Sequence, residues 1–576
     1  MGPSGVPDSD SSPASAARAP RSSGLTVRAL AAGSGLGAVL AAGNVYVCLK
    51  TGYVDGGSIP AAIAGFALLG LGRRKTPYSA DENNVTQAVA ASAAITTVAL
   101  GLSGSVPALV LLGAEIPAWA LIASGLLCSL LGVQIACALR PRLIEQECLP
   151  FPTGLATGEV IRAMHEVAGA GRRRAQVLGA SAAAAGVATW LRDGWPAWIP
   201  TFTPLPWLGS AEGLAAAGVS WSPLLFSTGL LIGLRGAASI LLGSVVGWIL
   251  LAPRLLPVGA RPSYEQLSGL LLWPGLAMTF GAMLVGLVRD GRGVGRAMRD
   301  LDGALFATGR WRPLALVVVL LFGLGLHALS LSLAQATLAI VIALVAALVC
   351  ARAVGETDQG PLGALGQLGQ LALGRLGAAT PGQTVAGAGL AANTGAHLAQ
   401  MLWAFRAGRA VGTPHSALVR AQLLGIGVGV LVAWPVYTLI TQQSQPGSGA
   451  FPAPSARLWA AMASVAREGS AAVSSETLVA SAVALGLAMA LALLEAVPRL
   501  GRRVPSAVGI GMGLLLPPSY GVSMFLGATL LVALRRKPAN WREMHVTAAG
   551  AGGIAGEAVL GVVIAALMAA GWMGRR

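Results

Sequence analysis

Long, continuous apolar runs, separated by short polar segments, dominate this sequence. Most of them are close to the roughly 20 residues that a helix needs to cross the hydrocarbon core of a bilayer. Hydrophobic residues make up 55% of the 576 residues and charged residues only 11%, against roughly 25% in soluble proteins. We therefore predict an all-α polytopic membrane protein, and exclude a water-soluble enzyme, a disordered chain and a coiled coil. The runs lie at about 27–49, 57–72, 86–113, 116–139, 175–192, 223–252, 266–288, 313–326, 328–351, 384–405, 417–441, 475–497, 504–533 and 546–573.

Two weaker apolar stretches, near 150–165 and 456–466, raise the predicted number of transmembrane helices from about fourteen to about sixteen. The runs do not alternate between apolar and polar residues over about 10 positions, which disfavours a membrane β-barrel. Residues 1–25 are polar and rich in Ser, Pro and Ala, a composition typical of disorder. We therefore expect a disordered cytoplasmic tail ahead of the membrane domain.

Basic residues outnumber acidic ones by 39 to 23, which gives a formal net charge of +16. In polytopic membrane proteins such an excess usually lies in cytoplasmic loops and sets the orientation of the chain. Because the basic clusters lie between apolar runs, we interpret the charge as a topological signal and expect no nucleic-acid partner. The clusters are Arg73–Lys75, Arg172–Arg174, Arg289–Arg299 and Arg535–Lys537.

The cysteines and histidines give no sign of a metal or cofactor site. The five cysteines lie in or beside apolar segments without CxxC spacing, and the five histidines have no partner at metal-ligand spacing. The sequence also lacks the Gly-Lys-Ser/Thr loop that holds nucleotide phosphates. We therefore predict a protein that is not an enzyme and that carries no cofactor.

Three pairs of similar segments recur in the same order along the chain. Gly52–Ala61 can be laid over Gly355–Ala364 at an offset of 303 residues, and Leu149–Ala156 over Gly449–Ala456 at an offset of 300. We predict two transmembrane repeats, residues 26–310 and 311–576, and the uncertain span count leaves open whether they are parallel or inverted. In the third pair, at an offset of 284, Ser222, Gly229, Ser239 and Gly243 match Ser506, Gly513, Ser523 and Gly527.

Proline and glycine residues gather at places where these repeats match, and they predict broken or re-entrant helices. Irregular backbone is tolerated at membrane depth only where protein or a water-filled cavity satisfies its polar groups. A break also exposes helix ends, whose partial charges suit the carboxylates and cations of a substrate. The predicted breaks involve Pro60, Pro150, Pro152, Pro452, Pro454, Pro517 and Pro518.

Ionisable residues inside apolar runs are costly, which makes them candidates for binding a substrate or an ion. Glu557 lies well inside the last run, where it could bind and release a proton during transport. Arg235 interrupts another run and could hold a substrate carboxylate. The alternative for both residues is a permanent ion pair, for example between Glu557 and Arg235.

Other polar residues beside the predicted breaks complete the set of candidate substrate- and ion-binding residues. Loop residues at a membrane boundary are the alternative interpretation for the acidic ones. The set consists of Lys50, Asp55, Glu159, Glu356 and Asp358, with Asn83, Asn84 and Asn393 in neighbouring runs.

The motifs as a group resemble the oligopeptide transporter family, which includes the yellow stripe-like metal-chelate transporters, and are most similar to the bacterial yellow stripe-like branch. The resemblance extends over residues 40–573 and implies a cavity role for Asn83, Asn84, Arg235 and Glu557. The segment containing Asn393 departs from the Ser/Gln-rich run that the family would lead one to expect. The matching segments are Asn44-Val45-Tyr46, Leu49–Gly52, Ser58–Ala62, Glu82–Gln87, Leu149–Gly154, Gly233-Leu234-Arg235, Gly355–Asp358, Phe451–Pro454, Pro505–Met512, Leu515–Ser519 and Ile554–Glu557.

The resemblance implies proton-coupled uptake of short peptides, peptide-like compounds or metal chelates across a bacterial inner membrane. We therefore expect a secondary active transporter that works by alternating access, with protons, its substrate and the lipid bilayer as partners. A homo-oligomer is compatible with the sequence. The alternatives are a membrane channel, which would need rings of like charge, and an intramembrane enzyme, which would need a nucleophile–base pair or a metal cluster.

Overall fold

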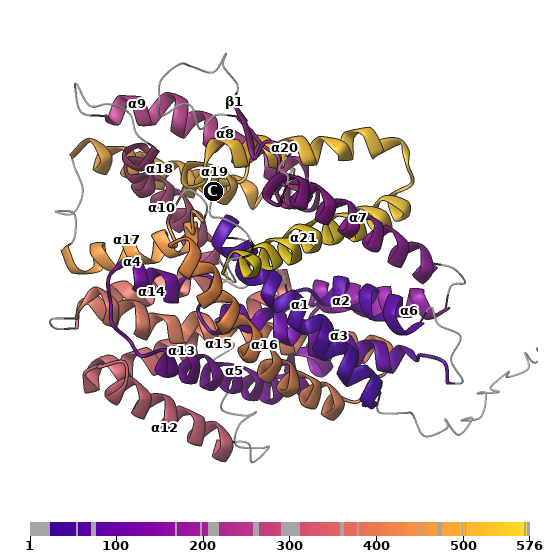
Figure 1. The fold of residues 1–576 in the computed structure, drawn as a ribbon. Coiled ribbons are helices and arrows are strands. Elements are labelled where there is room, and N and C mark those ends of the chain that lie inside the picture. The colour runs from indigo at the N-terminus through magenta and orange to yellow at the C-terminus, as the bar shows by residue number, and fades with distance from the viewer. Residues whose placement is uncertain are drawn as a thin grey trace, which may run out of the picture.

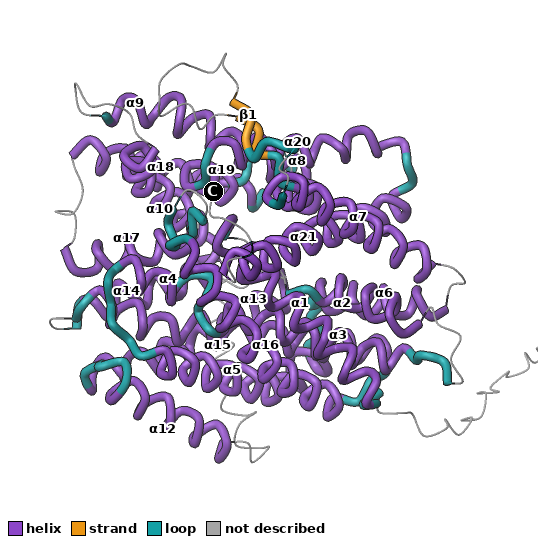
Figure 2. The backbone as a smooth tube through the Cα atoms, viewed as in Figure 1, coloured by secondary structure: helices purple, strands orange, loops and turns teal. Residues whose placement is uncertain are grey.

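The computed structural model describes residues 24–52, 54, 56–70, 76–166, 170–195, 198–204, 218–256, 264–289, 311–357, 362–376, 379–448, 451–468, 475–497, 499–501, 503–569 and 572. These residues are almost entirely helical, and one short antiparallel pair of strands, β1 and β2, interrupts the described helices (Figure 2). The predicted all-α fold class is confirmed. Eight of the described helices are long and apolar enough to cross a membrane, and shorter apolar helices include Ser58–Gly70, Trp311–His327 and Pro518–Ala533.

The first half of the chain contains elements that run from α1 to α10 (Figure 1). They are α1 (Val27–Thr51), α2 (Ser58–Gly65), η1 (Phe66–Gly70), α3 (Ala80–Ala99), α4 (Ser105–Leu111), α5 (Ala118–Arg140), η2 (Pro141–Gln146), α6 (Pro152–Glu166), α7 (Ala170–Asp193), β1 (Phe202–Pro204), β2 (Gly218–Ser220), α8 (Pro223–Ser244), η5 (Val245–Leu251), α9 (Ala252–Leu255) and α10 (Tyr264–Arg289).

The second half contains elements that run from α12 to α21. They are α12 (Trp311–His327), α13 (Leu333–Thr357), α14 (Leu362–Gly374), α15 (Pro381–Val411), α16 (His415–Gln443), α17 (Pro454–Glu468), α18 (Ser475–Glu495), α19 (Ala507–Leu515), α20 (Pro518–Ala533), η7 (Leu534–Arg536) and α21 (Ala539–Ala569).

Helices of the two halves are interleaved in space. The helices α1, α3 and α5 pack with α13, α15 and α16 in one group, and α8 and α10 pack with α18, α19 and α20 in another (Figure 1). The helices α7 and α21 lie side by side in the same view (Figure 1). Helices far apart in the sequence therefore share one core, which extends over both halves of the chain.

The helices α3 and α15 form the centre of the first group and run in opposite directions. Both begin with a capping box, formed by Ser79 with Glu82 and by Thr380 with Gln383. His397 lies near the middle of α15 and its Nε2 is 3.2 Å from Oγ1 of Thr96, late in α3. The end of α15 meets the start of α3, so the two helices are antiparallel.

Reciprocal glycine contacts join α8 to α19 and α20. A Cβ atom at Gly229 would overlap the backbone of Met524, and one at Gly513 would overlap the backbone of Ile240. The contact is reproduced when 284 is added to one residue number and subtracted from the other. Such an exchange is what a two-fold axis between equivalent surfaces produces. The same exchange relates the contact of Gly243 with Ile510 to that of Gly527 with Phe226.

These helices are also interrupted at corresponding positions. Gly233 leaves the helical conformation inside α8, with φ 83° and ψ 170°. At the same offset of 284, the chain is extended between α19 and α20, where Leu516 and Pro517 have ψ angles of 152° and 139°. The predicted break at Pro517 and Pro518 is therefore present, because Pro518 begins α20.

Two helices of equal length, α6 and α17, enter after a strained residue. Phe151 and Ala453 both have a φ of 42°, an uncommon conformation for residues with a side chain. The backbone N–H of Phe151 donates to the carbonyl of Gly355 over 3.0 Å, and that of Ala453 donates to Leu49 over 2.9 Å. Each half of the chain thus satisfies the end of a helix from the other half.

The start of α17 also corrects the alignment made from the sequence. That alignment paired Pro152 with Pro452, whereas the helices begin at Pro152 and Pro454. The correct offset is therefore two residues longer, because the phenylalanine that guided the alignment lies outside the conserved turn in the second half.

Candidate functional site

Glu557 lies near the middle of α21 and has no exposed surface. Its carboxylate accepts hydrogen bonds from every described group that contacts it. Lys50 Nζ lies 2.9 Å and Arg192 Nη2 3.1 Å from Oε1. Ser222 Oγ lies 2.8 Å from both carboxylate oxygens, and the backbone N–H of Leu224 donates to Oε2 over 2.9 Å.

The two cations come from the ends of two different helices. Lys50 belongs to the last turn of α1 and is 12% exposed, and Arg192 belongs to the last turn of α7 and is 4% exposed. Arg192 also donates to the carbonyl of Trp221 over 2.9 Å and to the carboxylate of Asp193. The guanidinium therefore has a fixed orientation, with one edge directed at Glu557.

The remaining donors belong to the first turn of α8. Ser222 is the N-cap of this helix, and its side chain accepts from Leu225 N at 3.3 Å while it contacts Glu557. The first N–H groups of a helix have no partner inside the helix and carry partial positive charge. The carboxylate of Glu557 thus completes the cap of α8 from a helix more than 300 residues later in the chain.

The cluster contains two positive and two negative side chains. The positive ones are Lys50 and Arg192, and the negative ones are Asp193 and Glu557. Among the described residues, no other charged side chain lies within ion-pairing distance of Glu557. An unpaired buried charge is costly, so this balance stabilises the cluster inside the bundle.

Aromatic residues and a tight turn connect the cluster to the second half of the chain. Lys50 Nζ lies 3.3 Å from Tyr46 OH and 5.3 Å from the centre of its ring. The Tyr46 ring in turn packs edge-to-face against Phe451, which lies just before α17. Gly52 ends α1 with a φ of 73°, and a Cβ atom there would press on Pro454. The cluster therefore lies where α1 meets the start of α17.

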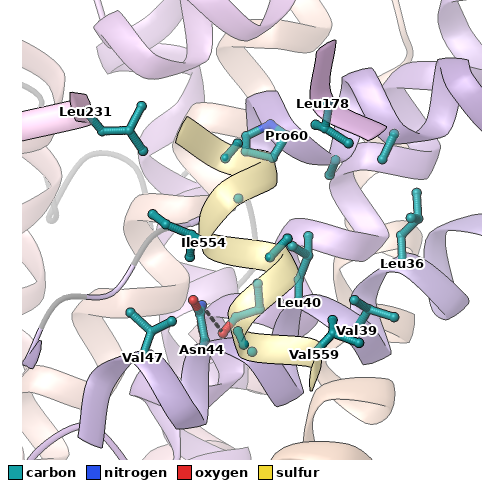
Figure 3. A pocket seen from close by; sticks show the side chains of 18 residues that line it. Leu36, Val39, Leu40, Asn44, Val47, Pro60, Leu178, Leu231, Ile554 and Val559 are labelled. Atoms are coloured by element: carbon teal, nitrogen blue, oxygen red, sulfur yellow. Dashed lines mark hydrogen bonds between the residues drawn. The ribbon is translucent and has the colours of Figure 1, made fainter. Parts of the chain in front are cut away.

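An apolar cavity of about 180 Å³ lies beside the cluster, between α1, α2, α7, α8 and α21 (Figure 3). Val47 lies one turn before Lys50 on α1, and Ala558 follows Glu557 on α21. Asn44 is the one polar side chain in the lining, and its Nδ2 donates to the carbonyl of Ala94 over 3.1 Å (Figure 3). The predicted break residue Pro60 also lines the cavity, from the first turn of α2.

A larger and more polar cavity, of about 570 Å³, lies farther along α17. Its lining includes Arg457, one turn after the start of α17, and Ser268 of α10, whose side chains are hydrogen-bonded at 3.1 Å. The loop Gln445–Ser448 also borders it. The start of α17 therefore separates a polar cavity from the charged cluster at the end of α1.

Of the residues predicted from the sequence, the structure brings together Lys50 and Glu557. Arg235 lies elsewhere, because it is 43% exposed and pairs with Glu495 at 3.2 Å. The alternative of an ion pair between Glu557 and Arg235 is therefore wrong in its partner, since Glu557 pairs with Lys50 and Arg192 instead.

The three predicted asparagines lie in the α3–α15 region. Asn84 donates to Thr413 over 2.9 Å, and Asn83 Nδ2 is 3.3 Å from His165 Nε2. Asn393 is buried in α15. These side chains serve packing contacts between helices and lie outside the cluster around Glu557.

The other predicted residues have no contact with the cluster that the structure describes. Glu159 is exposed on α6. Asp55 and Asp358 lie outside the described residues, as does the side chain of Glu356 at the end of α13. Pro150 accepts from Arg406 through its carbonyl at 3.2 Å, and Pro452 is buried just before α17.

The analysis of the sequence missed Arg192, Asp193 and Ser222. Arg192 and Asp193 end an apolar run as an adjacent pair of opposite charges, which is usually a boundary signal. Ser222 was noted as a repeat match, and Ser222-Pro223 is a helix-start signal that could have identified the cap. The sequence holds no signal that three distant segments converge on Glu557. Among the described residues, no group of three or more His, Cys, Asp or Glu could hold a metal ion.

Comparison with known proteins places these features in a family. The family profile described as "OPT oligopeptide transporter protein" matches residues 24–288 and 307–568. The chain is similar to a Haemophilus influenzae protein named "Putative oligopeptide transporter", at 24% identity over 91% of this chain and 93% of that protein. It is also similar to the Arabidopsis thaliana "Probable metal-nicotianamine transporter YSL8", at 25% identity over 36% of this chain and 29% of that protein.

Proposed function

Because this chain belongs to the OPT oligopeptide transporter family, we propose that it is a secondary active transporter for short peptides, peptide-like compounds or metal chelates. The names of the two relatives, one for oligopeptides and one for a metal chelate, support this range of substrates. The long apolar helices make the chain an integral membrane protein. Its substrates therefore have to cross the bilayer through the bundle.

The buried cluster around Glu557 is the observation that carries the proposal. Ionised side chains at membrane depth are expensive and typically line substrate or ion pathways. Here the ends of α1 and α7, the start of α8 and the middle of α21 converge on one carboxylate. Movement of any of these elements would alter the ion pairs, so the cluster can link substrate binding to a change of conformation.

Two inverted repeats, residues 26–310 and 311–576, form the framework for alternating access in this proposal. The antiparallel course of α3 and α15 supports it, since their capping boxes lie at corresponding positions. The exchanged glycine contacts of α8 with α19 and α20 support it as well. Transporters built from such repeats bind substrate between them and rock one unit against the other.

Protons drive uptake in this proposal, and Glu557 is the group that carries them. One elementary charge that crosses 100 mV gains about 2.3 kcal/mol, so one proton for each substrate supports roughly 50-fold accumulation. The basic clusters at Arg172–Arg174 and Arg535–Lys537 lie at the same end of the bundle, because α7 and α21 are parallel neighbours. This end faces the cytoplasm of a bacterium, by the rule that positive loops stay inside.

The test is uptake by the purified protein in proteoliposomes. A panel of radiolabelled di- and tripeptides and metal chelates is offered with an inward proton gradient, with a gradient collapsed by an uncoupler, and to empty liposomes. We expect saturable uptake that the gradient accelerates and that unlabelled substrates inhibit. Flux that does not saturate would favour a channel, and altered product recovered from the vesicles would favour an enzyme. Either result would overturn the proposal.

A further inference from the structure

We propose that the groups around Glu557 form the binding site for a substrate carboxylate, and that Glu557 occupies this site as an internal competitor while no substrate is bound. The inference rests on the proposed function, and it goes further by naming the chemical group that is recognised. Peptides and most peptide-like compounds end in a carboxylate, which is the group that Glu557 itself presents.

The donors around Glu557 match a free carboxylate. Two buried cations, one serine hydroxyl and one backbone N–H converge on its two oxygens at 2.8–3.1 Å. A carboxylate has about four lone-pair positions, and these donors fill them. None of the four groups recognises the rest of the glutamate side chain, so another carboxylate of the same shape fits the same donors.

Charge balance links substrate binding to a proton. When Glu557 is ionised the cluster has two positive and two negative groups, and a proton on Glu557 leaves one positive charge uncompensated. A substrate carboxylate that takes the place of Glu557 restores the balance. The proton and the substrate therefore bind together, which is the condition for symport.

The groups that face Glu557 are consistent with this exchange. Lys50 faces it from α1 with Tyr46 behind, and Arg192 faces it from α7 with Asp193 behind. Ser222 and the N–H of Leu224 face it from α8, and Tyr520 of α20 interacts electrostatically with Lys50. The phenols and the hydroxyl remain neutral, so Glu557 is the group in the cluster whose protonation opens the site.

The apolar cavity next to the cluster supplies space for the exchange (Figure 3). Its volume of about 180 Å³ is comparable with that of an engineered cavity that stays dry and binds benzene. A protonated carboxyl group can enter such surroundings far more readily than an ionised one. The cavity thus offers a place beside the donors for the neutral Glu557 side chain or for an apolar side chain of the substrate.

Removal of the competitor should make the site available to small carboxylates. In Glu557→Ala, we expect sodium acetate at pH 7 to bind saturably and to raise the unfolding temperature in detergent, whereas sodium chloride at equal ionic strength should not. Acetate should bind at least about tenfold more weakly to the wild type, because it must displace a charge-assisted contact. The matched control is Glu495→Ala, which also removes a carboxylate from an arginine and from the N–H of a helix start, Ala507.

Glu495 is 28% exposed and its pair with Arg235 is open, so Glu495→Ala should bind acetate no better than the wild type. A folded Glu557→Ala protein that does not bind acetate would overturn the inference. Equal acetate binding by the control variant would do so as well, since the effect would then be general.

A second measurement uses the unaltered protein, in case Glu557→Ala does not fold. Peptides with a free carboxyl terminus should inhibit uptake of a labelled peptide, and the same peptides with a C-terminal amide should inhibit at least about tenfold less. Equal inhibition by acids and amides would contradict the inference while leaving transport itself established. If the wild type takes up no member of the panel, the proposed function fails, and acetate binding still tests the carboxylate site on its own.

Discussion

Gly229 of α8 lies directly against the backbone of Met524 in α20, and no side chain fits between them. The equivalent contact, 284 residues away in each direction, joins Gly513 of α19 to Ile240 of α8. Close approach of small residues is how membrane helices gain packing energy, because lipid gives them no hydrophobic drive to associate. Two contacts related by exchange should also carry similar energies.

We therefore expect Gly229→Ala and Gly513→Ala to destabilise the protein to a similar extent. In each variant the methyl group meets backbone atoms, which cannot rotate away, so the cost should be of the order of 1–3 kcal/mol, as for other overpacked cores. The control is Gly35→Ala in α1, where a Cβ atom meets nothing within 4 Å. That variant should be neutral or stabilised by up to about 1 kcal/mol.

The measurement is thermal unfolding in detergent, followed by the recovery of a monodisperse protein. Loss of stability in one glycine variant but not in the other would show that the two contacts are not equivalent. That result would count against the two-fold relation between α8 and the pair α19–α20.

The balance of charge around Glu557 predicts a specific pattern in double variants. Glu557→Gln leaves an excess positive charge, and Lys50→Met leaves an excess negative charge. Breaking a buried pair from either side costs about 3–5 kcal/mol, mostly because the other charge stays buried and unpaired. The double variant Lys50→Met/Glu557→Gln restores neutrality, so it should lose clearly less stability than the sum of the single variants.

A double-mutant cycle on unfolding temperature or on denaturant midpoint measures this coupling. The control cycle uses Arg162 and Glu166, an exposed pair one turn apart on α6, where the coupling should be below about 0.5 kcal/mol. Additive losses at Lys50 and Glu557 would mean that the two charges do not compensate each other. Restored stability without restored uptake is expected, because the carboxylate that exchanges is absent.

The fold class could be predicted from the sequence because long apolar runs have few other structures available to them. The matches Gly229 with Gly513 and Gly243 with Gly527 also predicted correctly which residues have equivalent surroundings, since only glycine allows backbones to touch there. The alignment of Pro152 with Pro452 was wrong by two residues. A loop can take up such a shift without a change in the flanking helices, so its register is weakly recorded in the sequence.

The candidate site could be predicted only in part. Glu557 was identified because an ionisable residue interrupts an apolar run, and Lys50 because it precedes a glycine-rich break. Their pairing depends on how α1 and α21, about 500 residues apart, pack together, which no local pattern reports. Arg192 was passed over because a charged residue at the end of an apolar run is usually at the membrane boundary, whereas this one is 4% exposed.

Arg235 should contribute little to stability despite its place in an apolar run. Its pair with Glu495 is open to solvent or lipid headgroups, with the two side chains 43% and 28% exposed. Pairs of this kind contribute about 0–1 kcal/mol. Arg235→Gln should therefore unfold within a few degrees of the wild type and retain uptake. Folded Arg235→Gln protein without uptake would instead restore the sequence-based hypothesis that Arg235 holds the substrate.

Glu147 predicts how stability depends on pH at the loop before α6. Partial burial opposes ionisation of this carboxyl, but hydrogen bonds from Arg142 at 3.1 Å and Arg352 at 2.8 Å outweigh it and lower its pKa. A carboxyl with a lowered pKa in the folded state stabilises the protein above its unfolded pKa of about 4.3, and this contribution is lost as the pH falls further. Glu147→Gln should therefore lower the unfolding temperature at pH 7, with a difference that shrinks as the pH falls from about 5 to 3.5. Glu166→Gln, which alters the exposed pair with Arg162, should show almost no difference at either pH. A loss at Glu147 that stays constant over this range would mean that packing, and not the ionised carboxyl, joins the loop to α13.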